Sequence, residues 1–291
     1  MSNDLQRLEK PSVREIATKR LVHAMNSAQK LHDDMHAWWA EEDRQAQWVL
    51  SEGGRVLELV VDMPTTPPVD TWHLRANDIA QNLRGVMDAV ARHAAMEFVG
   101  PTSKSKIKFP TAMLETDQEW RQWKGHKVFP ADVVERFRQI QPFATRRLTL
   151  DGLRRFSNSE KHDFEVTASF LGSSAVIPHE VMPTSCEFPD AEVRDGRQTV
   201  LRVTYPQPIE APELGPDDYS FSVWLRVAKW TPPLGWESGA GPDTKADGDK
   251  VDIRLLEALD NWAHEVGWAL AFITGQYPSA TKAPEGTLNL S

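Results

Sequence analysis

Side chains able to bind ions or exchange protons recur along Trp72 to Phe98, a segment with helical periodicity. One set at three-to-four spacing is apolar: Leu83, Val86, Met87, Val90 and Ala94. A second set at the same spacing carries amides and opposite charges: Asn77, Gln81, Arg84, Asp88 and Arg92. Arg84 and Asp88 are one turn apart and can form an ion pair. Because asparagine and glutamine are a poor choice for a surface that only contacts solvent, we expect this polar face to be directed toward the interior of the protein.

A second group of polar residues, RRFSNSEKH from Arg154 to His162, lies where a helix is expected to end and a strand to begin. His162 suits a general acid or base near neutral pH, with Arg155 or Lys161 beside it to stabilise an anion. The alternative interpretation is a helix C-terminus, in which Lys161 and His162 interact favourably with the helix dipole and Asn158 or Ser159 caps the last turn.

We predict that the polar helix face and this junction share one enclosure. In that enclosure Arg84 and His162 are the candidate catalytic residues. The candidate ligand-binding residues are Asn77, Gln81, Asp88, Arg155, Asn158 and Lys161. A structure in which the two stretches lie apart would leave no site of this kind.

Other site chemistries have less support in the sequence. His32 and His36 are four residues apart on one helix, with Asp33 nearby, but a metal site would need a further ligand such as Asp260 or His264. No HExxH pattern is present, so no metal site is predicted. Cys186 has no adjacent histidine, and Gly-x-Ser-x-Gly, phosphate-loop and dinucleotide motifs are absent. No cofactor is therefore expected.

Composition bounds the class of protein. The chain has 291 residues, 40% of them hydrophobic, which is enough for a full core, and a formal net charge of -9 that disfavours general nucleic-acid binding. A single cysteine excludes an intramolecular disulfide and suits a reducing compartment. The N-terminal residues do not resemble a signal peptide and no apolar run approaches a bilayer span, so we expect a cytoplasmic protein without membrane insertion.

The chain changes character from helix to strand near residue 164. Before it we expect a long helix over 13–42 that begins at a Ser12/Glu15 capping box, a hairpin around Gly53-Gly54, and the helix over 72–98. Shorter helices are expected over 117–123, 130–140 and 148–159. After it, strands are expected over 164–170, 176–181, 199–205 and 219–229, then a loop over 237–250 and a helix over 251–274.

These elements predict an α+β fold in which a helical bundle packs against an antiparallel sheet. We expect one domain over 1–291: residues 12–162 mostly helical with an N-terminal hairpin, 163–236 antiparallel strands, 251–275 a closing helix, and 276–291 a flexible tail. The basic stretch from 131 to 161 lies inside an otherwise acidic chain and could hold an anion, although a solvated helix face explains it as well.

Several short motifs, taken together, resemble a broad family of uncharacterised bacterial proteins. They are NDIAQNLRGVMDAV from Asn77, FP at Phe109, QPF at Gln141, and LRRFSNSEKH from Leu153. Those proteins pair an LRxxLDH-like helix with a later DKH-like segment and have no established activity. This chain departs from the pattern, with Ala89 where histidine often follows the aspartate and Glu160 in place of aspartate. The resemblance implies a bacterial protein but no reaction.

The arginine and histidine spacing of that family is similar to the motif of HEPN ribonucleases, in which the two side chains meet across a helical dimer and cleave RNA without a metal. In this chain the match places Arg84 opposite Ala89, so the base is absent there. Arg121 with His126 and Arg155 with His162 also satisfy the spacing. A chain with this many arginines and histidines supplies such pairs by chance.

Two functions therefore stay open, and the sequence does not decide whether the protein is an enzyme. The first is an uncharacterised binding or interaction protein whose polar intra-bundle site holds an anionic ligand or a structural network. The alternative is a metal-independent HEPN-like ribonuclease, with Arg84 or Arg155 stabilising phosphate and His162 as acid and base. The net charge and Ala89 favour the first. The long first helix and eleven tryptophans favour a homodimer, with an anionic small molecule or RNA as partner.

Overall fold

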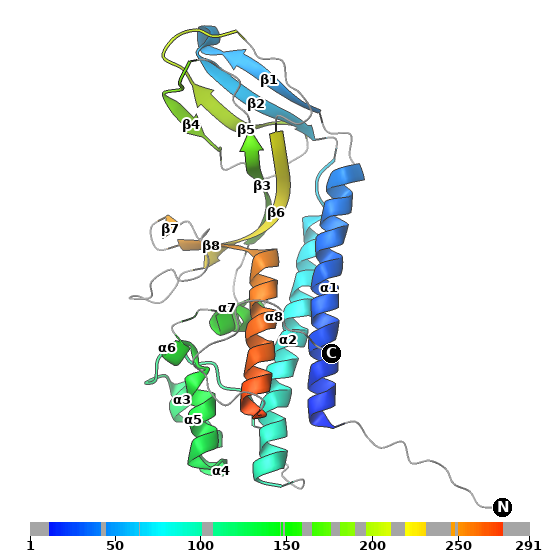
Figure 1. Cartoon of the computed structure of the whole chain (residues 1–291), viewed down its shortest axis with the longest axis vertical. Coiled ribbons are helices and arrows are strands. Elements are labelled where there is room, and N and C mark those ends of the chain that lie inside the picture. Colours follow the sequence, from blue (N-terminus) through cyan, green and yellow to red (C-terminus); the bar gives the residue numbers. More distant parts are fainter. Residues whose placement is uncertain are drawn as a thin grey trace, which may run out of the picture.

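The computed structural model has an α+β fold, with long helices toward one end of the molecule and antiparallel strands toward the other (Figure 1). It describes residues 12–41, 45–63, 65–100, 107–145, 147, 149–158, 165–175, 181–189, 196–210, 219–230, 246–247 and 250–275. Among these residues, no helix combines the length and the apolar character needed to cross a bilayer.

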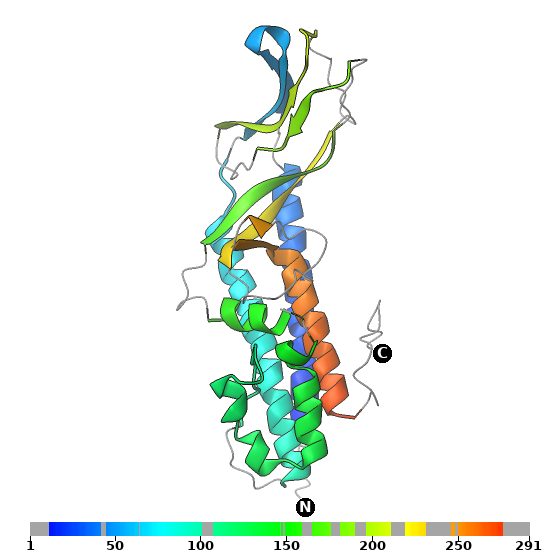
Figure 2. The ribbon, with the colours of Figure 1, turned by 90° about the vertical axis from the view of Figure 1, so that its left-hand side faces the viewer.

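Three long helices form the bundle: α1 (Val13–Glu41), α2 (Val69–Phe98) and α8 (Leu255–Ile273). The predicted capping box starts α1, since the Ser12 hydroxyl accepts the Glu15 N–H at 3.1 Å and the Glu15 carboxylate accepts the Ser12 N–H at 2.7 Å. α1 and α2 lie side by side, and α8 packs against both (Figures 1 and 2).

The inward faces of these helices carry apolar residues at helical spacing. The predicted stripe of α2 is buried at every position: Leu83, Val86, Met87, Val90 and Ala94. Alanines recur beside it, at positions 76, 80 and 91 of α2 and at 17, 24 and 28 of α1. Small side chains at these positions leave room for the two helices to approach closely. Helical period and residue size thus fix the α1–α2 pair.

Five short helices cover one side of the bundle, in the region shown in green in Figure 2. They are α3 (Gln118–Arg121), α4 (Gly125–Val128), α5 (Ala131–Gln139), α6 (Pro142–Thr145) and α7 (Thr149–Phe156). The predicted helices over 117–123, 130–140 and 148–159 correspond to α3, α5 and α7, although α7 ends three residues before the predicted boundary. α4 and α6 are single turns that the sequence pattern does not predict.

The strands of the described residues form two four-stranded sheets, both antiparallel. In the first, which we call the head sheet, the order is β1 (Gln45–Ser51), β2 (Val56–Met63), β5 (Gly196–Thr204), β4 (Ser185–Glu187). In the second the order is β3 (Glu165–Ala175), β6 (Tyr219–Trp230), β8 (Lys250–Arg254), β7 (Ala246–Asp247). The second sheet contacts the long helices through β3 and β6.

The predicted hairpin joins β1 to β2. Its turn is the 3-10 segment η1 (Glu52–Gly54), in which Gly53 and Gly54 have φ of 66° and 85°. A left-handed backbone costs glycine little because it has no Cβ. The Gly-Gly pair therefore reverses the chain where the sequence predicts it.

The structure corrects the predicted start of the closing helix. Residues 250–254 form β8, and α8 begins at Leu255. Val227 of β6 pairs with Ile253, and Arg226 pairs with Arg254. Residues that the apolar pattern assigns to the helix are therefore part of the sheet. The predicted strand over 176–181 lies outside the described residues except Val181, which is in a bend, and the predicted tail 276–291 also lies outside them.

Candidate functional site

The polar face of α2 makes inward contacts along its middle turns. Gln81 Nε2 donates to the carbonyl oxygen of Ser157, directly after α7. Arg84 Nη1 donates to Thr111 Oγ1 at 3.3 Å, and Asp88 Oδ1 accepts the backbone N–H of Phe109 at 3.1 Å. The structure thus brings Gln81 to the near end of the predicted junction. Arg84 and Asp88 contact a different segment.

Arg84 and Asp88 do not form the predicted ion pair in the part of the chain that the structure describes. Both side chains are directed to the segment 107–114. The spacing of one helical turn permits an i,i+4 pair but does not require one. A buried backbone N–H nearby competes for the carboxylate, since leaving it without a partner costs about 1–3 kcal/mol.

Asn158 and the arginines of α7 take structural positions. The Asn158 side-chain amide donates to the Arg154 carbonyl at 2.7 Å and so caps the last turn of α7, as the alternative interpretation predicts. Arg155 Nε lies 2.7 Å from Asp151 Oδ2. Lys161 and His162, the other predicted members of this junction, lie outside the described residues.

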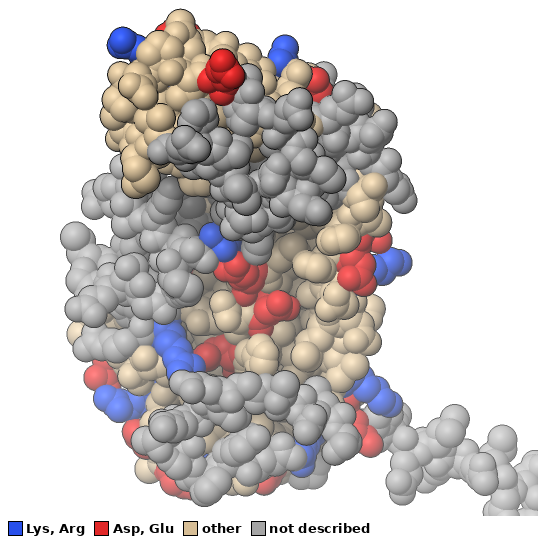
Figure 3. All heavy atoms as spheres, turned by 45° about the horizontal axis from the view of Figure 1, so that its top comes forward, with Lys and Arg blue, Asp and Glu red and all other residues tan. Residues whose placement is uncertain are grey.

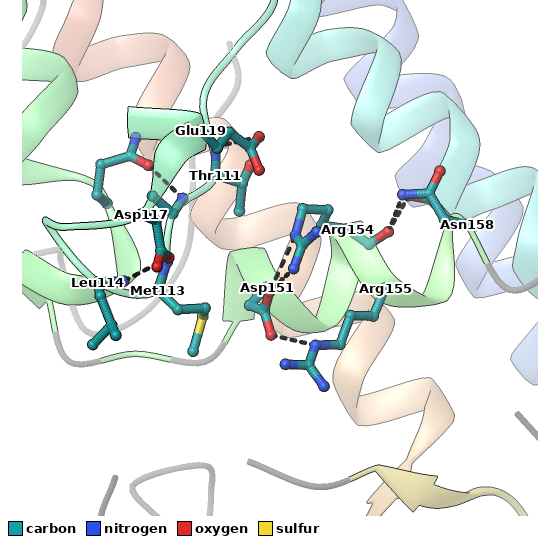
Figure 4. A network of polar contacts seen from close by, with 12 residues as sticks. Thr111, Met113, Leu114, Asp117, Glu119, Asp151, Arg154, Arg155 and Asn158 are labelled. Atoms are coloured by element: carbon teal, nitrogen blue, oxygen red, sulfur yellow. Dashed lines mark hydrogen bonds and ion pairs between the residues drawn. The ribbon is translucent and has the colours of Figure 1, made fainter. Parts of the chain in front are cut away.

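Asp151 organises α7 from within the core. Its side chain is 0% exposed and pairs with two arginines, Arg154 at 2.7 Å and Arg155 at 2.7 Å, whose side chains are 29% and 27% exposed. The three residues are related by i,i+3 and i,i+4 spacing on one short helix, and Figure 4 shows the two guanidinium groups on either side of the carboxylate. A buried carboxylate is stable only with such partners.

The segment 107–114, which we call the clamped segment, has no regular secondary structure and is nevertheless buried over most of its length. Side chains satisfy its backbone N–H groups one after another. The Thr111 N–H donates to Glu119 at 3.1 Å, and the N–H groups of Met113 and Leu114 both donate to Asp117, at 2.8 and 2.9 Å (Figure 4). Carboxylates thus take the place of a neighbouring strand.

Gln141 completes this arrangement from the core. Its side chain is fully buried, its Oε1 accepts the Ala112 N–H at 3.0 Å, and its Nε2 donates to the Phe137 carbonyl at 3.0 Å. One amide therefore ties the clamped segment to the C-terminal end of α5. The QPF motif thus supplies the bridging residue of this contact, Gln141, and the FP motif lies two residues before Ala112 in the clamped segment.

Trp120 and Trp123 form an aromatic cluster that contacts the clamped segment and also holds the ring of His126 in place. Trp123 Nε1 donates to the Lys108 carbonyl at 2.8 Å, and the rings of Trp120 and Trp123 stack 5.6 Å apart. His126 Nε2 lies 2.8 Å from the Trp120 carbonyl, and its ring is 4.8 Å from that of Trp120. The Arg121/His126 spacing therefore reflects a histidine engaged in packing.

Asn77 and His73 lie on α2 before Gln81, at successive turns. The Asn77 Oδ1 and His73 Nε2 atoms are buried without a hydrogen-bond partner. The His73 ring lies 5.9 Å from the ring of Phe156 of α7, and burial lowers the pKa of this histidine, with Asp70 opposing the shift. His73 was not predicted as a site residue from the sequence, although it lies one turn before Asn77 and shares the spacing of Asn77 and Gln81.

The residues considered for a metal site meet only in part. Burial raises the pKa of Asp260 on α8, and the charges of His264 and of His32 on α1 oppose this shift. The His32 side chain is 58% exposed. Among the residues that the structure describes, no group of three or more histidine, cysteine, aspartate or glutamate side chains is arranged to hold a metal ion. Acidic side chains gather on the middle of the face shown in Figure 3, in keeping with the negative net charge.

Five residues of the network were missed from sequence: Thr111, Asp117, Glu119, Gln141 and Asp151. Asp151 could have been found, because its spacing to Arg154 and Arg155 is that of an intrahelical ion pair. Thr111 and Gln141 act through long-range contacts with a segment that has no period.

Comparison with models of protein families, with curated proteins and with solved structures finds no match for this chain. The resemblance to uncharacterised bacterial proteins and to HEPN ribonucleases therefore stays a prediction. What the residues themselves show is a polar network joining α2, the clamped segment, α5 and α7.

The contact between Asp88 and Phe109 gives a first test of this network. We expect Asp88→Ala to lower the free energy of unfolding by about 1–2 kcal/mol, because the Phe109 N–H loses its acceptor in a half-buried place. Asp88→Asn keeps an acceptor oxygen and should cost less than about 0.5 kcal/mol. Urea denaturation followed by tryptophan fluorescence measures both. Equal losses in the two variants would show that the charge of Asp88, and not its hydrogen bond, is what matters.

Proposed function

We propose that this chain is a binding protein whose polar network presents Arg84 and Thr111 to a small anionic group. Asp88, Gln81 and Asn158 are each used to hold backbone groups of the fold. Arg84 differs from them, because its guanidinium is half-buried and has no carboxylate partner among the described residues. This unpaired cation is the observation that carries the proposal.

The Thr111 hydroxyl supports the same assignment. Thr111 is 3% exposed, and its oxygen accepts a hydrogen from Arg84. Its own hydrogen is therefore available to donate, and an oxyanion beside Arg84 would accept it.

Nearby carboxylates limit the affinity. Glu119 accepts the Thr111 N–H, Asp88 accepts the Phe109 N–H, and Asp151 is shared by Arg154 and Arg155. These negative charges offset much of the positive field of the arginines. We therefore expect a dissociation constant on the order of 1 mM for inorganic phosphate, which corresponds to about -4 kcal/mol of binding free energy.

Phosphate binding is tested by stability at constant ionic strength. With a dissociation constant of about 1 mM, 20 mM phosphate should raise the free energy of unfolding by about 1.8 kcal/mol relative to chloride. Arg84→Gln should abolish the difference. Arg92→Gln is the matched control, since Arg92 is exposed two turns further along α2, and this variant should keep the full effect.

Three outcomes would overturn this function or the site assigned to it. Equal stability of the wild-type protein in phosphate and chloride would leave the polar network with a purely structural role. Cleavage of a single-stranded RNA by the wild-type protein, lost in both Arg84→Gln and His162→Ala, would favour the metal-independent ribonuclease instead. Retention of the phosphate effect in Arg84→Gln would show that phosphate binds at another site.

We also propose that the protein is a cytoplasmic homodimer. The single cysteine suits a reducing compartment. Six of the tryptophans belong to the core and do not supply the interface: Trp48, Trp72, Trp120, Trp123, Trp262 and Trp268 are buried. We expect self-association to use a surface other than these six side chains.

A further inference from the structure

His73 of α2 is a titratable group inside the protein that the proposed anion site does not use. Its side chain is half-buried, and its Nε2 atom lies in the interior without a hydrogen-bond partner. The ring packs on Phe156, the last residue of α7, with 5.9 Å between the two ring centroids. Phe156 is itself 2% exposed and contacts the ring of Trp262 of α8. His73 therefore lies at the point where α7 meets the bundle.

A neutral imidazole suits this place, and an imidazolium does not. In the neutral ring one nitrogen carries no hydrogen, so Nε2 can remain unprotonated among apolar neighbours. Protonation would add an N–H and a positive charge at a buried atom, and a buried charge without a partner is costly. The Asn77 Oδ1 atom, one turn further along α2, is also buried without a partner and does not bond to Nε2. It therefore gives the proton no acceptor in this arrangement.

The charged groups of α2 and α7 do not compensate a protonated His73. Asp70, one turn earlier on α2, is the one charge among the described residues that favours the charged form of the ring, and it acts against burial. Burial is the larger effect and lowers the pKa of His73. On α7, Arg154 and Arg155 share the single carboxylate of Asp151, which leaves that helix with a net positive charge.

The other elements packed against this part of α2 are neutral at the contact. On α1, Asp34 reaches α2 but pairs with Arg75. On α8, the Trp262 ring lies 5.5 Å from the ring of Phe156. β3 also contacts α2, and the side chains that the structure describes on it, at residues 166–168, are uncharged. A charge on His73 would thus be stabilised only by water.

We propose that His73 is a pH-sensitive contact between α2 and α7, and that acidification loosens α7 by driving the protonated ring away from Phe156. The ring can be hydrated only by leaving this contact. The second contact of α2 with this end of α7 runs from Gln81 to the Ser157 carbonyl. It is made by an exposed side chain and does not replace the lost apolar packing.

The direction of the pH effect follows from proton binding. Burial holds the pKa of His73 below that of an exposed histidine, about 6.5, so the open state binds more protons than the packed state. The packed state is therefore fully favoured above about pH 6.5 and is lost progressively as pH falls below this value. A ring that stayed neutral throughout in the packed state would give the largest effect, about a thirtyfold rise of the opening constant between pH 8 and pH 5.

This contact is independent of the proposed anion site. Arg84 lies three turns beyond His73 on α2 and bonds to Thr111, whereas His73 packs on α7. The test below uses no anion. Failure of phosphate binding and failure of the pH response are thus separate results.

Hydrogen exchange of the Ser157 amide reports the opening of this junction. Its N–H donates to the Leu153 carbonyl at 2.9 Å, at the end of α7. After correction for the intrinsic exchange rate at each pH, its protection factor should fall by about three- to thirtyfold from pH 8 to pH 5 in the wild-type protein. Amides in the middle of α1 should keep their protection to within about twofold.

Matched variants show whether His73 is the group that titrates. His73→Phe keeps an aromatic ring against Phe156 and removes the titrating nitrogen, so the protection of Ser157 should no longer fall in this pH range. His73→Gln repeats the test if the phenylalanine variant does not fold. His93→Gln is the control, because it removes a histidine from the same helix, one that lies 3.3 Å from Glu97, and it should keep the full wild-type response.

The opposite results would overturn the inference. Constant protection of Ser157 in the wild-type protein, or an equal fall in His73→Phe and His73→Gln, would exclude His73 as a pH-sensitive contact. A parallel fall in the amides of α1 would show general unfolding by acid and would exclude a local effect on α7 as well.

Discussion

Replacing Asp151 with alanine is expected to lower the free energy of unfolding by about 3 kcal/mol. The carboxylate is fully buried and balances Arg154 and Arg155, so its loss leaves two guanidinium groups facing each other without a counter-charge. Both arginines are partly exposed and can turn toward water, which keeps the cost at the lower end of the range for broken buried ion pairs. Guanidinium denaturation followed by tryptophan fluorescence measures the change.

Two further variants show whether charge or shape is responsible. Asp151→Asn keeps the size of the side chain and removes the charge, and it should lose about half as much stability as the alanine variant. Arg154→Met leaves Arg155 in place to pair with Asp151 and should cost about 1 kcal/mol. A loss below about 0.5 kcal/mol in Asp151→Ala would contradict an organising role for this carboxylate in α7.

The helical period was sufficient to predict the apolar face of α2, whereas the polar face is turned inward only in part, since Gln81 and Arg92 are exposed. Leu83 and Val86 are buried where the apolar stripe places them, and Gln81 on the polar face reaches the end of α7. A repeat of 3.6 residues is a local property of the chain, so it can be read without knowing the partners. Which residues the polar face contacts depends on segments far away in sequence.

The clamped segment shows why those contacts could not be predicted. Its residues have no period of two or of 3.6, because its N–H groups bond to side chains such as Asp117 and Glu119 instead of to a helix or strand. Arg84 and Asp88 were predicted to pair with each other. In the structure each bonds to this segment, and a local spacing rule cannot anticipate that competition.

The predicted start of the closing helix was wrong because, here too, a contact far away in sequence decides the structure. Val251 and Ile253 alternate as in a strand, but they precede a strongly apolar helix and extend its pattern by four residues. Pairing with β6 decides in favour of the strand, at Val227 and Ile253. A short apolar run beside a helix is ambiguous until its neighbour in the sheet is known.

Substituting Gln141 with leucine is expected to lower the free energy of unfolding by about 2–4 kcal/mol. Leucine fills a similar volume but makes no hydrogen bond, so the Ala112 N–H and the Phe137 carbonyl are left without their side-chain partner in the core. Each buried polar group without a partner costs about 1–3 kcal/mol. Urea denaturation gives the total. Hydrogen exchange should show earlier opening of the clamped segment than of α1.

The Gln141→Glu variant tests the same contact through pH. A neutral glutamic acid can accept from the Ala112 N–H and donate to the Phe137 carbonyl, as the glutamine does, whereas the ionised form brings a charge against that carbonyl. Burial should therefore raise the pKa of the introduced carboxyl above its unfolded value of about 4.3. The variant should be close to wild type below pH 4 and lose stability as pH rises through the folded pKa. A stability difference that does not vary between pH 4 and pH 8 would show that Gln141 does not clamp this segment by its amide.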